Sequence, residues 1–284
     1  MESLRQTHQT RTEITSPTLS GGGYYVDTHA HLFDADFDTD RTQTIERAVA
    51  AGVRRIVLPA VDSRSHGALI NTVRQFPEVC RAAIGMHPTS VNENTRWRDE
   101  LQLVRELLRD RPVDWCAIGE VGLDLHWSTS SLTEQCQALV IQMQLAIEYD
   151  LPLILHVRDA WNEIFPLLEP LRGQIRGVFH SFQGTLKDYR HIKELGGFAV
   201  GIGGFITYKN SSTAKVLEGI DLEDIVLETD APYLTPVPYR GTRNESAHIP
   251  VIAARVAEIK GVPVETVMNV TTARAQHLFF RHST

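Results

Sequence analysis

Eight repeats of a short apolar run followed by an amphipathic stretch constrain the fold of this chain more than any other feature. The apolar runs are apolar throughout, which is typical of parallel strands buried on both faces. Units of about 25 to 30 residues, repeated eight times, predict a (β/α)8 TIM-type barrel, an α/β fold of about 250 residues. A doubly wound open sheet is the alternative, but no glycine-rich G-x-G-x-x-G pattern follows the first run.

The expected elements follow from these runs. We expect strands at residues 24–29, 54–61, 79–88, 113–124, 151–160, 175–182, 196–204 and 223–234. We expect helices at 39–51, 64–75, 97–110, 132–149, 159–168, 186–195 and 211–219, followed by two C-terminal helices near 246–260 and 263–280. Ser131 and Glu134 have the S-x-x-E spacing of a capping box, which predicts the start of the helix 132–149.

Residues 1–22 differ in composition from the rest of the chain. They are polar, with many Ser and Thr residues, and they run into the glycines 21–23. This composition predicts a disordered leader, and the lack of an apolar core within it argues against a secretory signal. We therefore expect a single barrel domain at residues 23–284.

Composition narrows the class of protein further. No apolar run reaches the length of about 18 residues that a transmembrane helix needs, so we expect no membrane span. Cys80, Cys116 and Cys136 lack C-x-x-C spacing and are expected to be buried thiols of a cytoplasmic protein. The net charge of −7 argues against bulk attraction to long nucleic acids but leaves room for a local basic site. No feature indicates an obligate protein partner.

Six residues that can bind a metal lie where expected strands end: His29, His31, Glu120, His156, His180 and Asp230. Residues i and i+2 of a strand point to the same face, so His29 and His31 can both face one ion. Each of the six alone is more often a surface or packed core residue. Together, at the carboxyl end of a barrel, they are costly to bury unless a cation compensates them. The pattern predicts a transition-metal site.

Eight segments then point to a family. Between about residues 26 and 280 the chain carries, in order, DTHAHL, GMHP, AIGEVGLDLH, LPLILHVRDA, GVFHSFQG, GIGGFITYKN, LETDAPYLTP and RNES. With these motifs it resembles the TatD-type metal-dependent deoxyribonucleases, a branch of the amidohydrolase-like barrels. The resemblance implies hydrolysis of DNA phosphodiester bonds by a 3′-to-5′ exonuclease that uses a metal-activated water, with single strands or 3′ ends as substrate.

The resemblance also implies roles for the six residues. The two histidines of the first strand and Asp230 are expected to bind one divalent ion. The histidines of the fifth and sixth strands are expected to bind a second, with Glu120 bridging the two. Asp230 is the expected general base and Glu120 the second catalytic residue. One or two zinc, manganese or magnesium ions are expected, and on ligand type an imidazole-rich site favours zinc, manganese or iron over magnesium.

Four further residues are candidate substrate contacts near the expected mouth: His87, Arg158, Lys209 and Arg243. Arg158 can hold a phosphate in a bidentate contact, but it can equally pair with the neighbouring Asp159. For Lys209 and Arg243 the alternative is a solvated loop charge. For His87 there are two alternatives to a substrate contact. It can contact a residue that binds the metal without binding the metal itself, or it can form a structural turn before Pro88.

Other residues near the mouth have structural interpretations. Asp124 is expected to anchor the loop after the fourth strand rather than bind a metal. Trp127, Tyr208 and Tyr233 lie in rim loops, where they either stack on bases of a single strand or cover the top of the barrel. Arg274 stands where the family usually carries asparagine, on the last helix and away from the mouth, so we interpret it as a packing change.

Two other functions remain open. The runner-up is an amidohydrolase-type enzyme that acts on a small amide, ester or phosphotriester. Many such enzymes use a carboxylated lysine as the bridging ligand, whereas the fourth strand here offers Glu120, which favours the nuclease branch. The third hypothesis is a metal-binding protein without catalysis, and the presence of Asp230 as a possible base argues against it.

Overall fold

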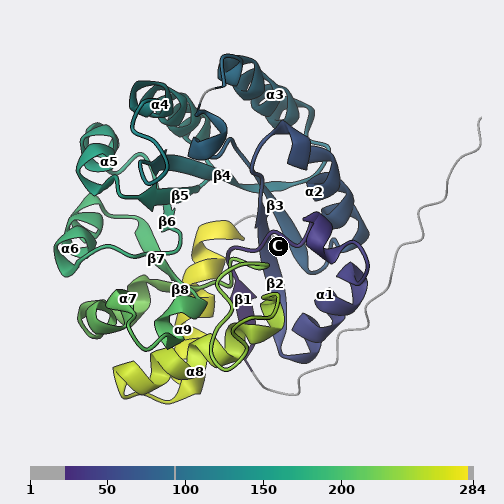
Figure 1. Cartoon of the computed structure of the whole chain (residues 1–284), viewed down its shortest axis with the longest axis vertical. Helices are drawn as coiled ribbons and strands as arrows, with labels where there is room; N and C mark the ends of the chain where they lie inside the picture. Colours follow the sequence, from purple (N-terminus) through teal and green to yellow (C-terminus); the bar gives the residue numbers. More distant parts are fainter. Residues whose placement is uncertain (1–22, 93, 281–284) are drawn as a thin grey trace, which may run out of the picture.

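Eight parallel strands follow one another around a single sheet in the same order as along the chain (Figure 1). The computed structural model describes residues 23–92 and 94–280. The strands are β1 (Tyr25–Asp27), β2 (Val53–Pro59), β3 (Cys80–Ile84), β4 (Trp115–Asp124), β5 (Leu153–Arg158), β6 (Gly177–Phe179), β7 (Phe198–Ile202) and β8 (Ile225–Leu227). The predicted (β/α)8 barrel is confirmed, and the sequential strand order excludes the doubly wound alternative.

Contacts between β1 and β8 close the ring. The backbone N–H of Thr28 donates to the carbonyl of Leu227 at 3.0 Å. Ala30 and Ala231 form an isolated parallel bridge just beyond the two strands. The ends of the first and last strands therefore lie side by side, although Ala30 and Ala231 are 201 residues apart in the sequence.

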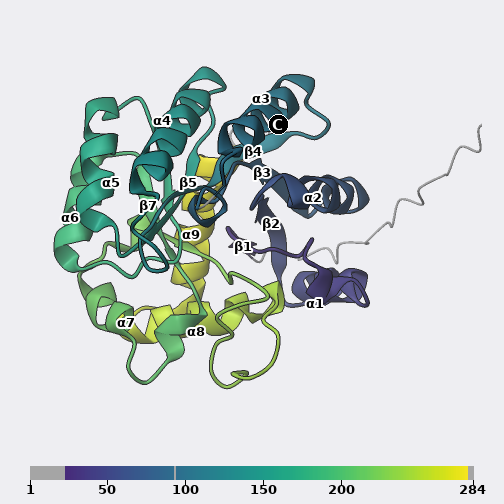
Figure 2. The same ribbon diagram turned by 45° about the horizontal axis from the view of Figure 1, so that its top comes forward.

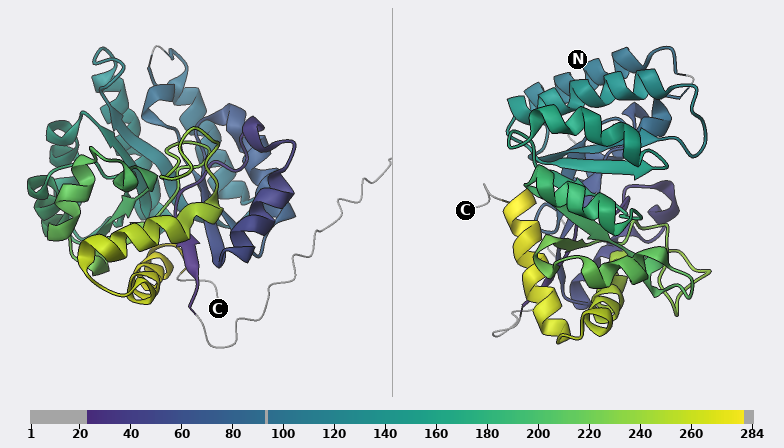
Figure 3. Two further views of the ribbon diagram at one scale, coloured as in Figure 1. Left: turned by 60° about the horizontal axis from the view of Figure 1, so that its bottom comes forward. Right: turned by 90° about the vertical axis from the view of Figure 1, so that its left-hand side faces the viewer.

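Helices surround the barrel (Figures 1 and 2). The ring contains α1 (Arg41–Ala50), α2 (Ser63–Gln75), α3 (Trp97–Asp110), α4 (Leu132–Glu148), α5 (Trp161–Leu168), α6 (Leu186–Leu195), α7 (Ser212–Val216) and α8 (Ile249–Lys260). The last helix, α9 (Val264–Phe279), lies on the side opposite the long loop that joins β8 to α8 (Figure 3). None of the helices described combines the length and apolar character needed to cross a bilayer.

Several expected boundaries differ from the structure. β1 ends at Asp27, so His29 and His31 lie beyond it. β4 ends at Asp124 as expected, but Glu120 lies inside this strand and not at its end, because Val121 to Asp124 still pair with β5. α4 begins at Leu132 as expected, but the side chain of Ser131 makes no capping hydrogen bond. The expected leader, residues 1–22, lies outside the described residues.

The apolar core has two main parts, which the sheet separates. The larger part lies between the strands and the surrounding helices. The smaller part fills the barrel, with inward residues of the strands packed against Ala275, Leu278 and Phe279 of α9. α9 therefore covers the amino-terminal end of the barrel. Arg274 lies on this helix and donates to the backbone carbonyl of Phe198, the first residue of β7, so it is remote from the carboxyl end.

Candidate metal centre

A polar layer lies directly above the apolar filling of the barrel. Ile154 and Val178 belong to that filling. The residue two positions further along a strand points to the same side, and these positions hold His156 and His180. The carboxyl ends of the strands therefore direct imidazoles inward, to the end of the barrel where sites are built.

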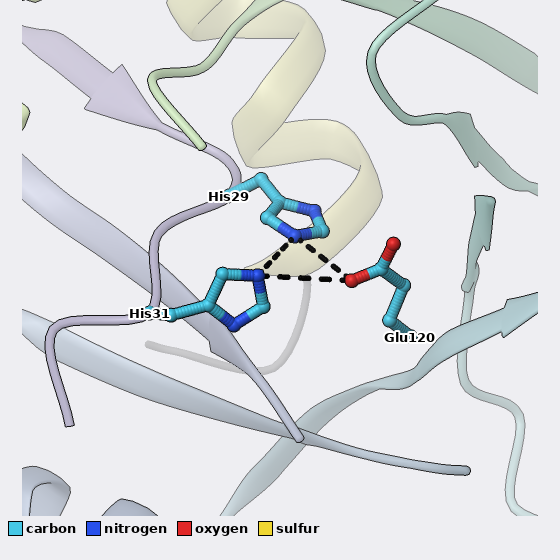
Figure 4. Close-up of side chains that lie close together, drawn as sticks. All are labelled: His29, His31 and Glu120. Carbon is cyan, nitrogen blue, oxygen red and sulfur yellow. Dashed lines mark hydrogen bonds and ion pairs between the residues drawn. The ribbon is translucent and has the colours of Figure 1, made fainter. Parts of the chain in front are cut away.

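His29, His31, Glu120 and Asp230 form what we call the first donor group. The Nε2 atoms of His29 and His31 lie 3.1 Å apart. Oε2 of Glu120 lies 3.2 Å and 3.7 Å from these two nitrogens. Oδ1 of Asp230 lies 3.7 Å and 3.5 Å from them. Figure 4 shows the two rings and one Glu120 oxygen converging, while the other oxygen points away.

The first donor group fits a divalent cation. Four ligand atoms about 2.0 to 2.1 Å from a tetrahedral ion lie about 3.3 Å from one another, close to the separations of 3.1 to 3.7 Å found here. The carboxylates only accept hydrogen bonds, and each neutral imidazole carries one N–H. A cation would compensate this convergence of acceptors.

The other oxygen of Glu120 faces His156 and His180, which we call the second donor group, and also lies near His87. Oε1 lies 2.9 Å from Nδ1 of His156 and 3.3 Å from Nε2 of His87. It lies 3.7 Å from Nε2 of His180. Glu120 thus presents one oxygen to each donor group, an arrangement suited to a carboxylate that joins two ions.

Glu228 holds His180 from the side away from Glu120. Its Oε1 lies 3.1 Å from Nδ1 of His180 and accepts a hydrogen bond from the backbone N–H of Ser181. A carboxylate this close to Nδ1 favours a proton on that nitrogen electrostatically, which leaves Nε2 facing Glu120 as the ligand atom. Gly201 on β7 makes room for Glu228, because a Cβ there would lie 2.1 Å from Oε2.

Asp124 supports His156 in the same way. Its Oδ2 lies 2.9 Å from Nε2 of His156, and its Oδ1 accepts from the backbone N–H of His126 at 3.0 Å. The first contact leaves Nδ1 of His156 facing Glu120 as a ligand atom. The second anchors the loop after β4, the structural role expected from the sequence. Asp124 therefore links that loop to the centre.

His87 faces the centre with its Nε2, but its hydrogen bonds differ from those of the other histidines. Its Nδ1 accepts from the backbone N–H of Thr89 at 3.2 Å. Burial lowers its pKa, so the ring is neutral and, with Nδ1 an acceptor, carries its proton on Nε2. His87 is consequently arranged to donate toward Glu120 rather than to offer a lone pair to a metal.

Burial opposes charge throughout the centre, and at some residues the neighbouring charges outweigh its effect on the pKa. Burial lowers the pKa of His29. Around His180 the carboxylates, Glu228 first, outweigh burial and raise the pKa to about 10. Burial alone would raise the pKa of Glu120, but the imidazoles around it, His87 first, hold that pKa well below its usual value. Protons on imidazoles such as His180 therefore compete with a cation for this centre.

Asp27 ties the first and last strands together beneath the first donor group. Its fully buried carboxylate accepts hydrogen bonds from the backbone N–H groups of His29 and Thr229 and from the hydroxyl of Thr229. The backbone N–H of Asp230 in turn donates to the carbonyl of His29 at 2.8 Å. Asp230 has a φ of +58°, a conformation uncommon outside glycine. These bonds hold Asp230 in that conformation beside His29 and His31.

The remaining candidate contacts lie apart from the two donor groups. Arg158 and Lys209 are exposed, at the end of β5 and in the segment after β7. Arg243 instead donates to both carboxylate oxygens of Asp40, at 2.8 Å and 2.7 Å, and its guanidinium lies over the ring of Phe37. The donors of Arg243 are thus largely engaged within the protein.

Glu228 and the contact between Asp124 and His156 were not part of the sequence prediction. A signal for Glu228 was present, because it follows inward Val226 by two residues, as His180 follows Val178. No comparable signal exists for the Asp124 contact, which depends on the path of β4 beyond Glu120.

Comparisons with known proteins agree with this geometry. The profile of the family described as TatD related DNase matches residues 26–280. An uncharacterized metal-dependent hydrolase of Bacillus subtilis, YabD, is 35% identical over 255 residues, covering 89% of this chain and 98% of the relative. A protein of Citrobacter koseri named 3′-5′ ssDNA/RNA exonuclease TatD is 31% identical over 261 residues, covering 89% and 98%.

A solved structure is also similar. The crystal structure of YJJV, a TatD homolog from Escherichia coli k12, superposes with a TM-score of 0.84 at 29% identity. The match covers 90% of this chain and 97% of that chain.

Proposed function

The chain belongs to the TatD-related DNase family of metal-dependent hydrolases, and from this premise we propose that it hydrolyses phosphodiester bonds of single-stranded DNA from the 3′ end. The family resemblance expected from the sequence motifs is confirmed. The Citrobacter relative named as a 3′-5′ ssDNA/RNA exonuclease supports the substrate and the polarity.

One observation carries the proposal: the two oxygens of Glu120 face different sets of imidazoles. Oε2 faces His29 and His31, and Oε1 faces His156 and His180. Two divalent ions would be held by His29, His31 and Asp230 on one side of Glu120 and by His156 and His180 on the other, with Glu120 serving both. When bound, such ions lower the pKa of water and stabilise the charge that develops on a phosphoryl group.

Asp230 is the proposed general base. Its side chain retains 16% exposure, against 0% for His29 and 4% for Glu120, so it is the group of the first donor set most open to water and substrate. As the oxygen of an attacking water bonds to phosphorus, Asp230 accepts a proton of that water. The bond from phosphorus to the 3′ oxygen of the preceding nucleotide breaks, and this leaving oxygen takes a proton from solvent. Burial raises its pKa, but the neighbouring imidazoles, His180 first, lower it overall, so Asp230 is ionised at neutral pH.

Other side chains are assigned to binding. Arg158 and Lys209 are exposed cations that we propose contact phosphates outside the scissile bond. Nε2–H of His87 is arranged to donate, and we propose that it orients Glu120 or a phosphate oxygen. Arg243 has its donors bonded to Asp40, so we do not include it among the proposed phosphate contacts.

The ligand set favours zinc or manganese over magnesium. Magnesium prefers oxygen ligands and retains waters, whereas the histidines supply most of the ligand atoms here.

We also propose a cytoplasmic location, because Cys80 and Cys116 are buried free thiols of a kind that needs no oxidising compartment.

The test is a substrate panel with metal removal. Protein stripped by a chelator and then given Mn²⁺, Zn²⁺ or Mg²⁺ is incubated with a 5′-labelled single strand and with small amides, esters and phosphotriesters. The proposal predicts metal-dependent shortening of the labelled strand from its 3′ end. Hydrolysis of a small substrate with an intact strand would instead support the amidohydrolase alternative, and metal binding without hydrolysis would support a non-catalytic protein.

A further inference from the structure

Trp127 is the most exposed large hydrophobic side chain of the described residues, at 71%. Trp97 and Trp115 are buried, and Trp161 is only partly exposed. Trp127 therefore does not cover the top of the barrel, one of the two roles considered from the sequence. An indole left in water at the mouth of a site indicates a surface for a flat ligand.

The guanidinium of Arg158 packs against the indole of Trp127. Cζ of Arg158 lies over the Trp127 ring, 5.5 Å from its centroid, which is within the range of a cation–π contact. The ring of His126 meets the indole edge-on, with centroids 5.0 Å apart. His126 in turn lies 2.9 Å from a carboxylate oxygen of Asp159, so the loops after β4 and β5 are joined beneath the indole.

The indole is held close to the metal centre. Asp124 accepts from the backbone N–H of His126 with one oxygen and contacts His156 with the other. The backbone N–H of Leu125 also donates to the carbonyl of Arg158 at 2.9 Å. Trp127 is three residues from Asp124, a span of at most about 11 Å. A ligand on the indole would thus extend directly from the centre.

A second exposed aromatic residue lies across the mouth. Tyr233, in the loop after β8, is 56% exposed, and its ring centroid lies 6.3 Å from that of His31. β4 and β8 are four strands apart in a ring of eight, so Trp127 and Tyr233 flank opposite sides of the centre. A substrate that reaches both is larger than a small amide or ester and carries more than one flat group.

We propose that Trp127, with Arg158 against its face, is a stacking platform for an unpaired base of the nucleic acid strand whose end lies at the metal centre. This inference rests on the proposed function and deepens it, because it explains a preference for single strands. Bases of a duplex already stack on one another, whereas bases of a single strand are free to stack on an aromatic side chain. Arg158 adds a cation beside the backbone of the strand.

The experiment uses intrinsic fluorescence of the Mn²⁺-loaded protein. The probe is a phosphorothioate oligothymidylate, chosen to resist hydrolysis, and it is compared with a duplex and with an abasic strand of equal length. Trp127 is the tryptophan most accessible to a base, so stacking should quench the emission with the oligothymidylate and not with the abasic strand. Both Trp127 variants lack the reporting indole, so their affinities are measured by a gel mobility shift of the same strands. Trp127→Leu should weaken binding by about 5- to 150-fold, while Trp127→Phe keeps most of the affinity.

Ile147→Ala is the matched control, since Ile147 is a 39% exposed apolar residue on α4 and lies away from the loops of the mouth. It should bind like the parent. Equal affinity of the parent and Trp127→Leu, or of the oligothymidylate and the abasic strand, overturns the platform. If the parent shortens an unmodified strand in the same preparation, that result leaves the proposed function intact. A parent that neither binds nor cleaves any strand overturns both proposals.

Discussion

Oε1 of Glu228 lies 3.1 Å from Nδ1 of His180, so a buried carboxylate favours the tautomer of this histidine in which Nε2 faces Glu120 as a ligand atom. Glu228→Gln should weaken binding of the second metal ion by about 10- to 100-fold, because an amide holds the ring tautomer less strongly. Equilibrium titration with Zn²⁺ against a chelating dye measures the change. Glu223→Gln, an exposed substitution before the start of β8, serves as the control and should bind like the parent. Unchanged affinity in Glu228→Gln would remove the role assigned to Glu228.

Gly201→Ala tests the same contact from β7. A Cβ at residue 201 would lie 2.1 Å from Oε2 of Glu228, so the carboxylate must move away from His180. We expect a loss of metal affinity similar to that of Glu228→Gln, with little added effect when the two substitutions are combined. The matched control is Gly203→Ala, where the nearest atom would lie 3.6 Å from the new Cβ. The idea fails if both alanine variants bind metal equally.

Metal binding should release protons at neutral pH. Neighbouring carboxylates raise the pKa of His180 to about 10, so the metal-free protein holds a proton on this ring at pH 7 that an ion must displace. The apparent affinity should therefore rise with pH between about 6 and 8. Calorimetry in two buffers of different ionisation enthalpy counts the protons. Equal heats in both buffers, with an affinity independent of pH, would contradict this assignment.

The buried thiols should be unreactive in the native protein. Burial raises the pKa of Cys80 and of Cys116 to about 12, so almost no thiolate is present at pH 8. Cys136 is partly exposed and provides the internal comparison. A thiol reagent should label Cys136 fastest, with Cys80 and Cys116 labelled only after denaturation, as mass spectrometry of the digested protein would show. Rapid native labelling of Cys80 or Cys116 would show that the core opens.

The sequence could predict the barrel and the clustering of six side chains because both depend on simple periodicities. Apolar runs at regular spacing specify parallel strands, and the two-residue period directs His156 and His180 inward. The interpretation of Glu120 as the end of its strand was wrong, since pairing between β4 and β5 continues to Asp124. Strand ends depend on tertiary pairing, which a single sequence does not display.

Other features of the site depend on contacts in the folded protein that the sequence does not display. Which nitrogen of His180 is protonated follows from Glu228, which is 48 residues away in sequence, 228 − 180 = 48. The position of the proton on Nε2 of His87 follows from the hydrogen bond that its Nδ1 accepts from the backbone N–H of Thr89. Trp127 could be read from sequence as a cover or as a platform, and its 71% exposure favours the platform.

The most direct measurement of the central claim compares DNA hydrolysis by the parent, Glu120→Gln and Asp230→Asn during a Mn²⁺ titration. Asparagine keeps the shape of Asp230 but cannot accept the proton of the attacking water, so Asp230→Asn should lose about 10²- to 10⁴-fold in rate and recover little at high metal. Glu120→Gln weakens a bridging ligand, so high Mn²⁺ should restore part of its rate. Full recovery of Asp230→Asn at high metal would show that Asp230 is only a ligand, and full activity of this variant without added metal would contradict the mechanism.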